Sequence, residues 1–93
     1  MEFEWDAAKN QINIKKHGVD FDEAKTVFDD ILAVIIDDRF HSNIEQREII
    51  VGESSKYRLL YVVFVERGDC IRIISARKLT TAERRGYEQG KFD

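Results

Sequence analysis

The chain has 93 residues, of which 43% are apolar and 35% are charged, and its formal net charge is −3 at pH 7. This length supports one domain, and the apolar fraction is too high for a disordered segment. The single cysteine, Cys70, excludes an internal disulfide framework, and the longest apolar run (59–65) is far shorter than the roughly 20 residues of a membrane-spanning helix. We therefore expect one cytoplasmic domain over residues 1–93, with no membrane anchor.

The N-terminal third predicts a short strand and two helices. Residues 1–5 alternate acidic with aromatic side chains, as a strand with one buried face does. A first helix is expected over residues 6–16, with an aspartate as its N-cap, and Gly18 can adopt the positive φ that ends a helix. A second helix is expected over residues 20–28, because apolar residues recur on one face and Glu23 completes a capping box.

Four extended segments joined by short turns are expected in the middle of the chain. They are rich in β-branched residues, and the third is apolar on both faces, as a central strand is. A tight hairpin turn is expected between Glu66 and Asp69, and short connections of this kind favour an antiparallel meander. The four segments cover residues 31–36, 47–52, 59–66 and 70–77.

The last expected helix begins at Thr80, because Thr80 and Glu83 form a capping box, and it continues to Tyr87. The element order is then a strand, two helices, four strands and a helix. This order predicts an α+β fold with a small antiparallel sheet, two N-terminal helices and a C-terminal helix, with the helices packed on one face of the sheet.

Charge is distributed unevenly along the sequence. Residues 20–48 hold nine acidic side chains against three lysines and arginines, whereas residues 71–85 hold five basic side chains against one acidic side chain, Glu83. The net charge of −3 is therefore the sum of an acidic middle and a basic C-terminal segment. The basic segment is the part of the chain that suits an anionic partner such as a nucleic acid.

The last strand supplies the best candidate site, because the sequence lacks the motifs of nucleotide-dependent enzymes, serine hydrolases and zinc hydrolases. Strand alternation puts Ile71, Ile73, Ser75 and Arg77 on one face and Arg72 on the other. An arginine at the end of a packed strand can clamp a phosphate with its planar fork, or it can form a salt bridge there. The alternation predicts that Arg72 and Arg77 do not act together.

Two histidines are candidates for acid–base chemistry. His17 follows Lys16 in the last turn of the first expected helix, where the pair can act on a substrate or can simply satisfy the helix carbonyls. His41 lies in a polar stretch and is expected to be an exposed loop residue. In the expected hairpin, Glu66 and Arg67 are either site residues or ordinary turn residues.

Short motifs that follow one another along nearly the whole chain point to a known family. The most specific are Lys16-His17-Gly18 and Ile71 to Arg77. The others are Glu4-Trp5-Asp6, Phe21 to Asp29, Asp38-Arg39, Arg47 to Gly52, Leu59 to Val63, Glu83 and Tyr87. Together they resemble the BrnT family, the toxin half of bacterial BrnT/BrnA type II toxin–antitoxin systems. One departure is Ile31, where relatives often carry proline.

The resemblance implies a RelE-like fold and an endoribonuclease that cleaves mRNA and stops translation. It also implies a BrnA-like antitoxin as the protein partner. The antitoxin carries a DNA-binding segment, so the complex represses its own operon and operator DNA is contacted only through the antitoxin. Neither a cofactor nor a metal is implied, since such an enzyme uses the RNA 2′-hydroxyl as its nucleophile.

The chemistry implied by the resemblance assigns roles to particular residues. Arg77 would hold the non-bridging phosphate oxygens, assisted by Arg67 or Lys16. His17 or Glu66 would serve as acid and base. Further RNA contacts, which include stacking by the tyrosine, are expected from Arg72, Lys78, Arg84 and Tyr87.

A second hypothesis is a non-enzymatic module of the same fold, which binds nucleic acid or a partner without cleaving RNA. A purely structural role is a third, but it does not explain the charge asymmetry. The acidic residues of segment 20–48 either bind a basic region of the antitoxin or only keep the chain soluble. RNA cleavage distinguishes the first hypothesis from the second.

Overall fold

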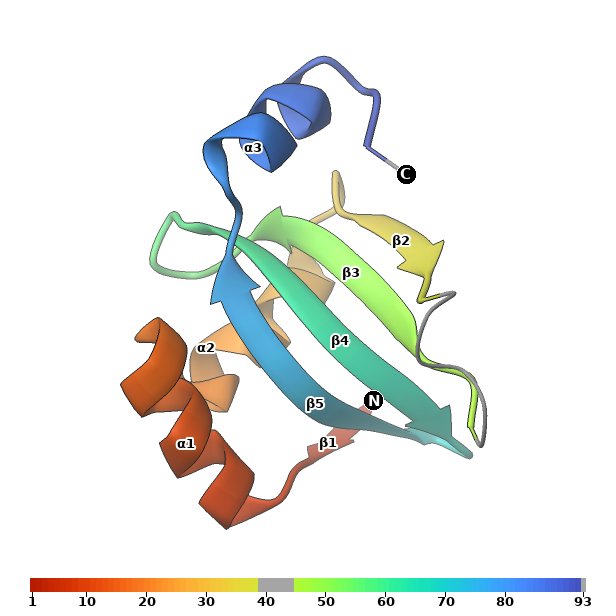
Figure 1. Cartoon of the computed structure of the whole chain (residues 1–93). Coiled ribbons are helices and arrows are strands. Elements are labelled where there is room, and N and C mark those ends of the chain that lie inside the picture. The colour runs from red at the N-terminus through yellow and green to blue at the C-terminus, as the bar shows by residue number, and fades with distance from the viewer. Residues whose placement is uncertain (39–44, 93) are drawn as a thin grey trace.

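The computed structural model describes residues 1–38 and 45–92. In chain order the elements are β1 (Glu2–Glu4), α1 (Ala7–His17), α2 (Phe21–Ala24), the 3₁₀ helix η1 (Lys25–Asp29), β2 (Val34–Asp37), β3 (Glu48–Glu53), β4 (Leu59–Arg67), β5 (Cys70–Lys78) and α3 (Thr81–Glu88). Figure 1 shows one curved sheet with α1 beside it, α2 behind it and α3 beyond one end. The expected α+β class and element order are confirmed. No helix in the described ranges is long and apolar enough to cross a membrane.

The sheet is mixed, with five strands in the order β1-β5-β4-β3-β2. Strands β2 to β5 form the antiparallel meander that their short connections predict. Strand β1 pairs in parallel with β5, with Phe3 opposite Ile71, so the expectation of an antiparallel sheet is wrong for this strand. No hairpin sets the direction of β1, because two helices and the whole meander separate it from β5. The edge-to-face contact of Phe3 with Phe28, at 5.1 Å between ring centres, contributes to its placement.

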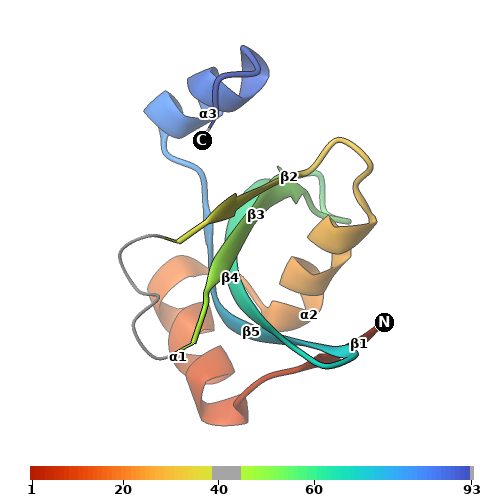
Figure 2. The ribbon, with the colours of Figure 1, turned by 90° about the vertical axis from the view of Figure 1, so that its right-hand side faces the viewer.

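The main core lies on the concave face of the sheet, which curves around α2 and η1 (Figure 2). Phe21 and Val27 are fully buried there against strand residues such as Val62 and Phe64. The second expected helix divides into α2 and η1 near Thr26, whose hydroxyl donates to the carbonyl oxygen of Glu23 at 2.7 Å. This local side-chain bond competes with regular α-helical bonding, so the continuation tightens into a 3₁₀ helix.

The opposite face of the sheet carries a second apolar cluster, and the C-terminal segment covers part of it. Ile49 and Val51 are buried there, and Leu79, Tyr87 and Phe92 pack against this cluster. The expectation that all helices share one face is therefore wrong for α3. The predicted capping box is present, but the strand that leads into α3 directs it past the end of the sheet.

A β-bulge in β5 interrupts the alternation of its side chains. Val63 lies opposite Ser75, but the next residue of β4, Phe64, lies opposite Ile73. Ile74 is therefore an extra residue with no partner of its own in the ladder.

The bulge changes which residues of β5 share a face. Before it, Ile71 and Ile73 point into the main core; after it, Ala76 does. Arg77 therefore projects from the same face as Arg72, so the prediction that they lie on opposite faces is wrong. The two arginines still stand at opposite ends of the strand.

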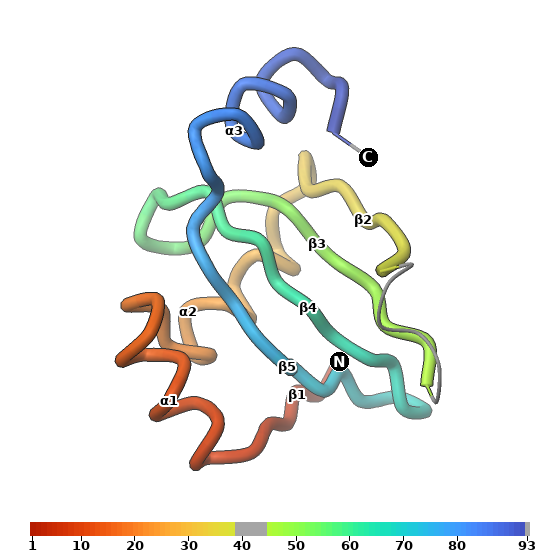
Figure 3. Tube along the Cα trace, viewed as in Figure 1, coloured from red at the N-terminus to blue at the C-terminus, as the bar shows by residue number. Residues whose placement is uncertain are grey.

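Two buried asparagines attach α1 to its surroundings. The amide of Asn13 accepts from the backbone N–H of Ala76 at 3.2 Å and donates to the carbonyl oxygens of Ala76 at 2.8 Å and Val19 at 2.9 Å. Beyond the end of β1, the Asn13 amide thus makes the backbone hydrogen bonds to β5 that a neighbouring strand would make. Asn10 accepts from the N–H of Phe21 at 2.9 Å. These bonds hold α1 alongside β5 (Figure 3).

The carboxylate of Glu23, a residue only 4% exposed, joins the β3–β4 loop to the helices. Arg58 donates to it through Nε at 2.9 Å and through Nη2, which also donates to the carbonyl oxygen of Gly18 at 3.1 Å. The hydroxyl of Ser54 donates to it at 2.6 Å. The hydrogen bonds from Arg58 hold the pKa of Glu23 below its usual value.

Replacing Arg58 with methionine should lower the free energy of unfolding by about 3 kcal/mol, because the Glu23 carboxylate would stay buried without its main partner. Urea unfolding at pH 7 measures the loss. Adding Glu23→Gln to Arg58→Met removes the unpaired charge and should recover part of it. Equal losses in the single and double variants would contradict the ion-pair explanation.

Candidate functional site

Arg77 leaves the end of β5 and lies between a carboxylate and an aromatic ring. Its Nη1 and Nη2 donate to the two carboxylate oxygens of Glu83 at 2.8 and 3.0 Å, and Nη1 also donates to the carbonyl oxygen of Lys78 at 3.2 Å. Its guanidinium carbon lies 4.0 Å from the centre of the Tyr61 ring. The salt bridge that was the alternative interpretation of Arg77 is therefore formed, and the planar fork is held in one orientation.

Glu83 has two partners at once. One of its oxygens accepts from the backbone N–H of Thr80 at 2.9 Å, which completes the cap of α3, while both oxygens bind Arg77. The hydrogen bonds from Arg77 lower the pKa of Glu83 to about 2. Glu83 is therefore ionised at neutral pH and is a poor proton acceptor, which suits it to position Arg77 rather than to act as a general base.

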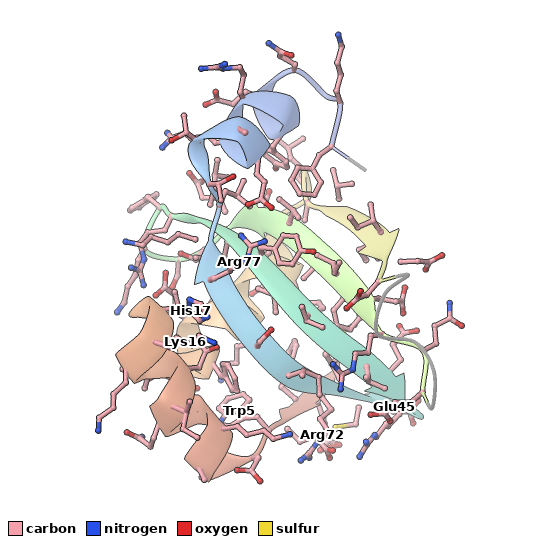
Figure 4. The ribbon with its side chains drawn as sticks, in the orientation of Figure 1. Trp5, Lys16, His17, Glu45, Arg72 and Arg77 are labelled. Atoms are coloured by element: carbon pink, nitrogen blue, oxygen red, sulfur yellow. The ribbon has the colours of Figure 1, made fainter. Side chains whose placement is uncertain are left out.

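Lys16 and His17 lie in the last turn of α1, at the same end of the molecule as Arg77 (Figure 4). The bonds between Asn13 and Ala76 place this turn beside the C-terminal half of β5. The helix ends at Gly18, which has the predicted positive φ of 69°. Three of the five residues predicted to be catalytic therefore lie toward the same end of the molecule.

Glu66 and Arg67, the other two, lie at the opposite end of the sheet. Arg77 is paired with Tyr61 across the ladder, and Glu66 stands five residues further along β4, which corresponds to about 16 Å. One phosphate cannot contact both groups. The predicted catalytic set therefore divides into two separate sites. His41 lies outside the described residues.

Carboxylates surround the basic side chains at that second end. Arg67 donates to Glu45 at 2.9 Å, and Arg72 donates to Glu4 at 3.0 Å. Figure 4 labels Glu45 and Arg72 at this end of the sheet. Burial, reinforced by a neighbouring carboxylate of β4, raises the pKa of Glu48 nearby. Such an acidic environment disfavours a phosphate group, and Arg72 lies far from the other residues predicted to bind RNA.

A hollow of about 450 Å³ lies between the β3–β4 loop and α3, and the other three predicted RNA-binding residues, Lys78, Arg84 and Tyr87, line it. Tyr87 has a structural role there as well, because its hydroxyl donates to the carbonyl oxygen of Leu32 at 3.2 Å. Tyr57, which the sequence analysis missed, also lines the hollow. Nothing in the sequence pattern predicts that the backbone of Tyr57 has a positive φ.

Comparison with known proteins identifies the family. A family model described as "Ribonuclease toxin, BrnT, of type II toxin-antitoxin system" matches residues 5–83. The chain belongs to the BrnT family. The matched range includes all five residues predicted to be catalytic and also Glu83, whereas Arg84 and Tyr87 lie beyond it.

A solved structure supports the same family assignment. The crystal structure of the Brucella abortus ribonuclease toxin BrnT is similar to this chain, with a TM-score of 0.69 and 26% sequence identity. The similarity covers 87% of this chain and 99% of the Brucella chain. No curated protein sequence matches significantly. The family predicted from the sequence motifs therefore agrees with both comparisons, and the crystal structure also agrees with the predicted α+β class.

Replacing Glu83 with glutamine should reduce stability at pH 7 by about 1 kcal/mol, since the bidentate charged pair is lost at a partly exposed site. The folded pKa of about 2 lies below the ordinary value of 4.5, so this contribution is present above pH 4.5 and is lost as the pH falls toward 2. As the pH falls from 4.5 toward 2, the free energy of unfolding measured with urea should therefore decrease less in the variant than in the wild type. Parallel pH profiles for the variant and the wild type would contradict this.

Proposed function

We propose that the chain is the toxin of a type II toxin–antitoxin pair and that it cleaves RNA, with mRNA as the cellular target, at the end of the sheet that carries Arg77. One observation supports this proposal beyond family membership: Arg77, Lys16 and His17 lie toward the same end of the molecule, where Lys78 and Arg84 line a hollow together with Glu53 and Glu88. The opposite end of the sheet is rich in carboxylates.

The proposed reaction uses the RNA itself as nucleophile and needs no metal. The 2′-hydroxyl attacks the adjacent phosphorus, the bond to the 5′-oxygen breaks, and a 2′,3′-cyclic phosphate remains. Negative charge grows on the non-bridging oxygens, and Arg77 is the group that would stabilise it. Because Glu83 and Tyr61 already orient the guanidinium, little reorganisation is needed when a phosphate takes over part of the fork.

His17 is the proposed proton carrier of the site. Imidazole is the side chain whose ordinary pKa allows it to accept and donate protons near neutral pH, and Lys16 supplies an adjacent cation. Glu83 does not suit this role because it stays ionised. Glu66 and Arg67 have no role in the proposed step, because they lie at the other end of the sheet.

A BrnA-like antitoxin is the proposed protein partner, and operator DNA would be contacted only through it, when the complex represses its own operon. Neutralisation would require the antitoxin to cover or distort the Arg77 end of the sheet. The proposed reaction takes place in the cytoplasm, where mRNA is translated.

The alternative is a module that binds RNA without cleaving it. The ion pair between Arg77 and Glu83 favours this alternative, because both terminal nitrogens of the guanidinium, Nη1 and Nη2, already donate to the carboxylate. Steep salt dependence of RNA binding with intact RNA ends would be its signature.

Replacing Arg77 with alanine should lower the rate of RNA cleavage by about 10²- to 10³-fold, because a transition-state donor is removed. The measurement is the cleavage of 5′-labelled RNA in the presence of a metal chelator. Glu83→Gln is the comparison variant, since it breaks the ion pair that orients the guanidinium but keeps the guanidinium itself, and it should lose clearly less activity than Arg77→Ala. Equal losses in both variants would give Arg77 a structural role, and a folded wild type that leaves RNA intact would support the binding module.

Replacing His17 with glutamine should reduce cleavage at least tenfold, whereas Glu66→Gln should leave it nearly unchanged, because only His17 lies at the Arg77 end. The same cleavage assay, with RNA affinity measured in parallel, tests the pair. A loss of cleavage in Glu66→Gln but not in His17→Gln would instead place the reaction at the β4–β5 hairpin.

A further inference from the structure

Tyr57 has an unusual backbone conformation. It is the one non-glycine residue with a positive φ, 61°, among residues 1–38 and 45–92. Its N–H donates to the carbonyl oxygen of Ser54 at 2.9 Å, and the N–H of Ser54 donates to the carbonyl oxygen of Arg58 at 2.8 Å. Hairpin loops of this kind usually carry glycine at the left-handed position, because a side chain is disfavoured there.

Burial of the ring does not compensate for this conformation, since Tyr57 is 84% exposed. The loop is instead held by its neighbours: Ser54 and Arg58 bind the Glu23 carboxylate, and the N–H of Ser55 donates to the hydroxyl of Thr26 at 2.8 Å. The surrounding contacts thus impose the conformation and present the ring to solvent. Backbone strain that the rest of the fold maintains is concentrated at functional positions in proteins.

The hollow beside Tyr57 combines three kinds of side chain. Lys78 and Arg84 supply positive charge, Tyr57 supplies an open aromatic face, and Glu53 and Glu88 supply carboxylates. Phosphate ions alone would leave the ring and the carboxylates unused. A nucleotide uses all three, because its phosphate binds cations, its base stacks on an aromatic ring and its amino groups donate to carboxylates.

We propose that Tyr57 stacks on an unpaired nucleobase of single-stranded RNA held in the hollow between the β3–β4 loop and α3. Lys78 lines this hollow and directly follows Arg77 at the end of β5, so the proposed nucleotide would be a neighbour of the one whose phosphate lies at Arg77. The inference rests on the proposed function, to which it adds a substrate-binding contact.

Glycine at position 57 provides a clean test, because it removes the ring and accepts the positive φ without strain. The probe is a fluorescently labelled single-stranded oligoribonucleotide with 2′-O-methyl groups, which cannot be cleaved by 2′-hydroxyl attack. Tyr57→Gly should bind it about tenfold more weakly than the wild type, while Tyr57→Phe and Tyr57→Trp should bind it as the wild type does. The melting temperature of Tyr57→Gly should be unchanged or higher, which shows that the loss is not caused by unfolding.

An oligonucleotide that lacks bases distinguishes stacking from a general effect on the loop. The wild type and Tyr57→Gly should bind this abasic probe equally well, and their salt dependence should be the same, since phosphate contacts are retained. Equal binding of the base-containing probe by the wild type and Tyr57→Gly would overturn the inference. The exposed ring would then be a candidate contact for a protein partner. A Tyr57-dependent affinity without any cleavage of natural RNA would support the inference and refute the proposed ribonuclease activity.

Discussion

The buried carboxylate of Glu23 is the contact on which the arrangement of the site depends. A charge removed from water has to be compensated by directed donors, and here both side-chain donors come from the β3–β4 loop, from Ser54 and Arg58. Arg58 also reaches the carbonyl oxygen of Gly18, next to the helix turn that carries His17. One carboxylate therefore fixes the distance between segments that are remote in sequence, and the hollow has a defined wall because this loop cannot move independently of the helices.

The two ends of β5 show how a chain with net negative charge can offer a site for an anion. Both ends carry an arginine on the same face of the sheet. Arg72 contacts Glu4 in acidic surroundings, whereas Arg77 lies on the ring of Tyr61 and its carboxylate partner, Glu83, also serves as a helix cap. Local geometry, and not the total charge, is what distinguishes Arg77 as the candidate phosphate ligand.

Local signals predicted most of the elements and part of the site. The caps at Asp6 and Thr80 and the glycine at 18 are short-range effects, and the structure has all three. The direction of β1 and the face covered by α3 depend on contacts between remote segments, so periodicity could not supply them. For the same reason the prediction placed Glu66 and Arg77 in one catalytic set, since neither motifs nor alternation show which end of a strand lies beside which helix. The conformation of Tyr57 is set by its neighbours and has no signature of its own.

The bulge at Ile74 affects how related sequences should be compared. The bulge supplies one residue more than regular alternation needs between Ile73 and Ala76, so a strand of the same length without a bulge would place the Arg77 side chain on the face that packs on α2. The loss of one residue at the bulge would instead restore regular alternation, with Ala76 still in the core and Arg77 still on the opposite face. A relative that is one residue shorter between positions 71 and 77 can therefore keep the arrangement of Arg77, and a gap aligned at this point of the strand does not mean that the arrangement is lost.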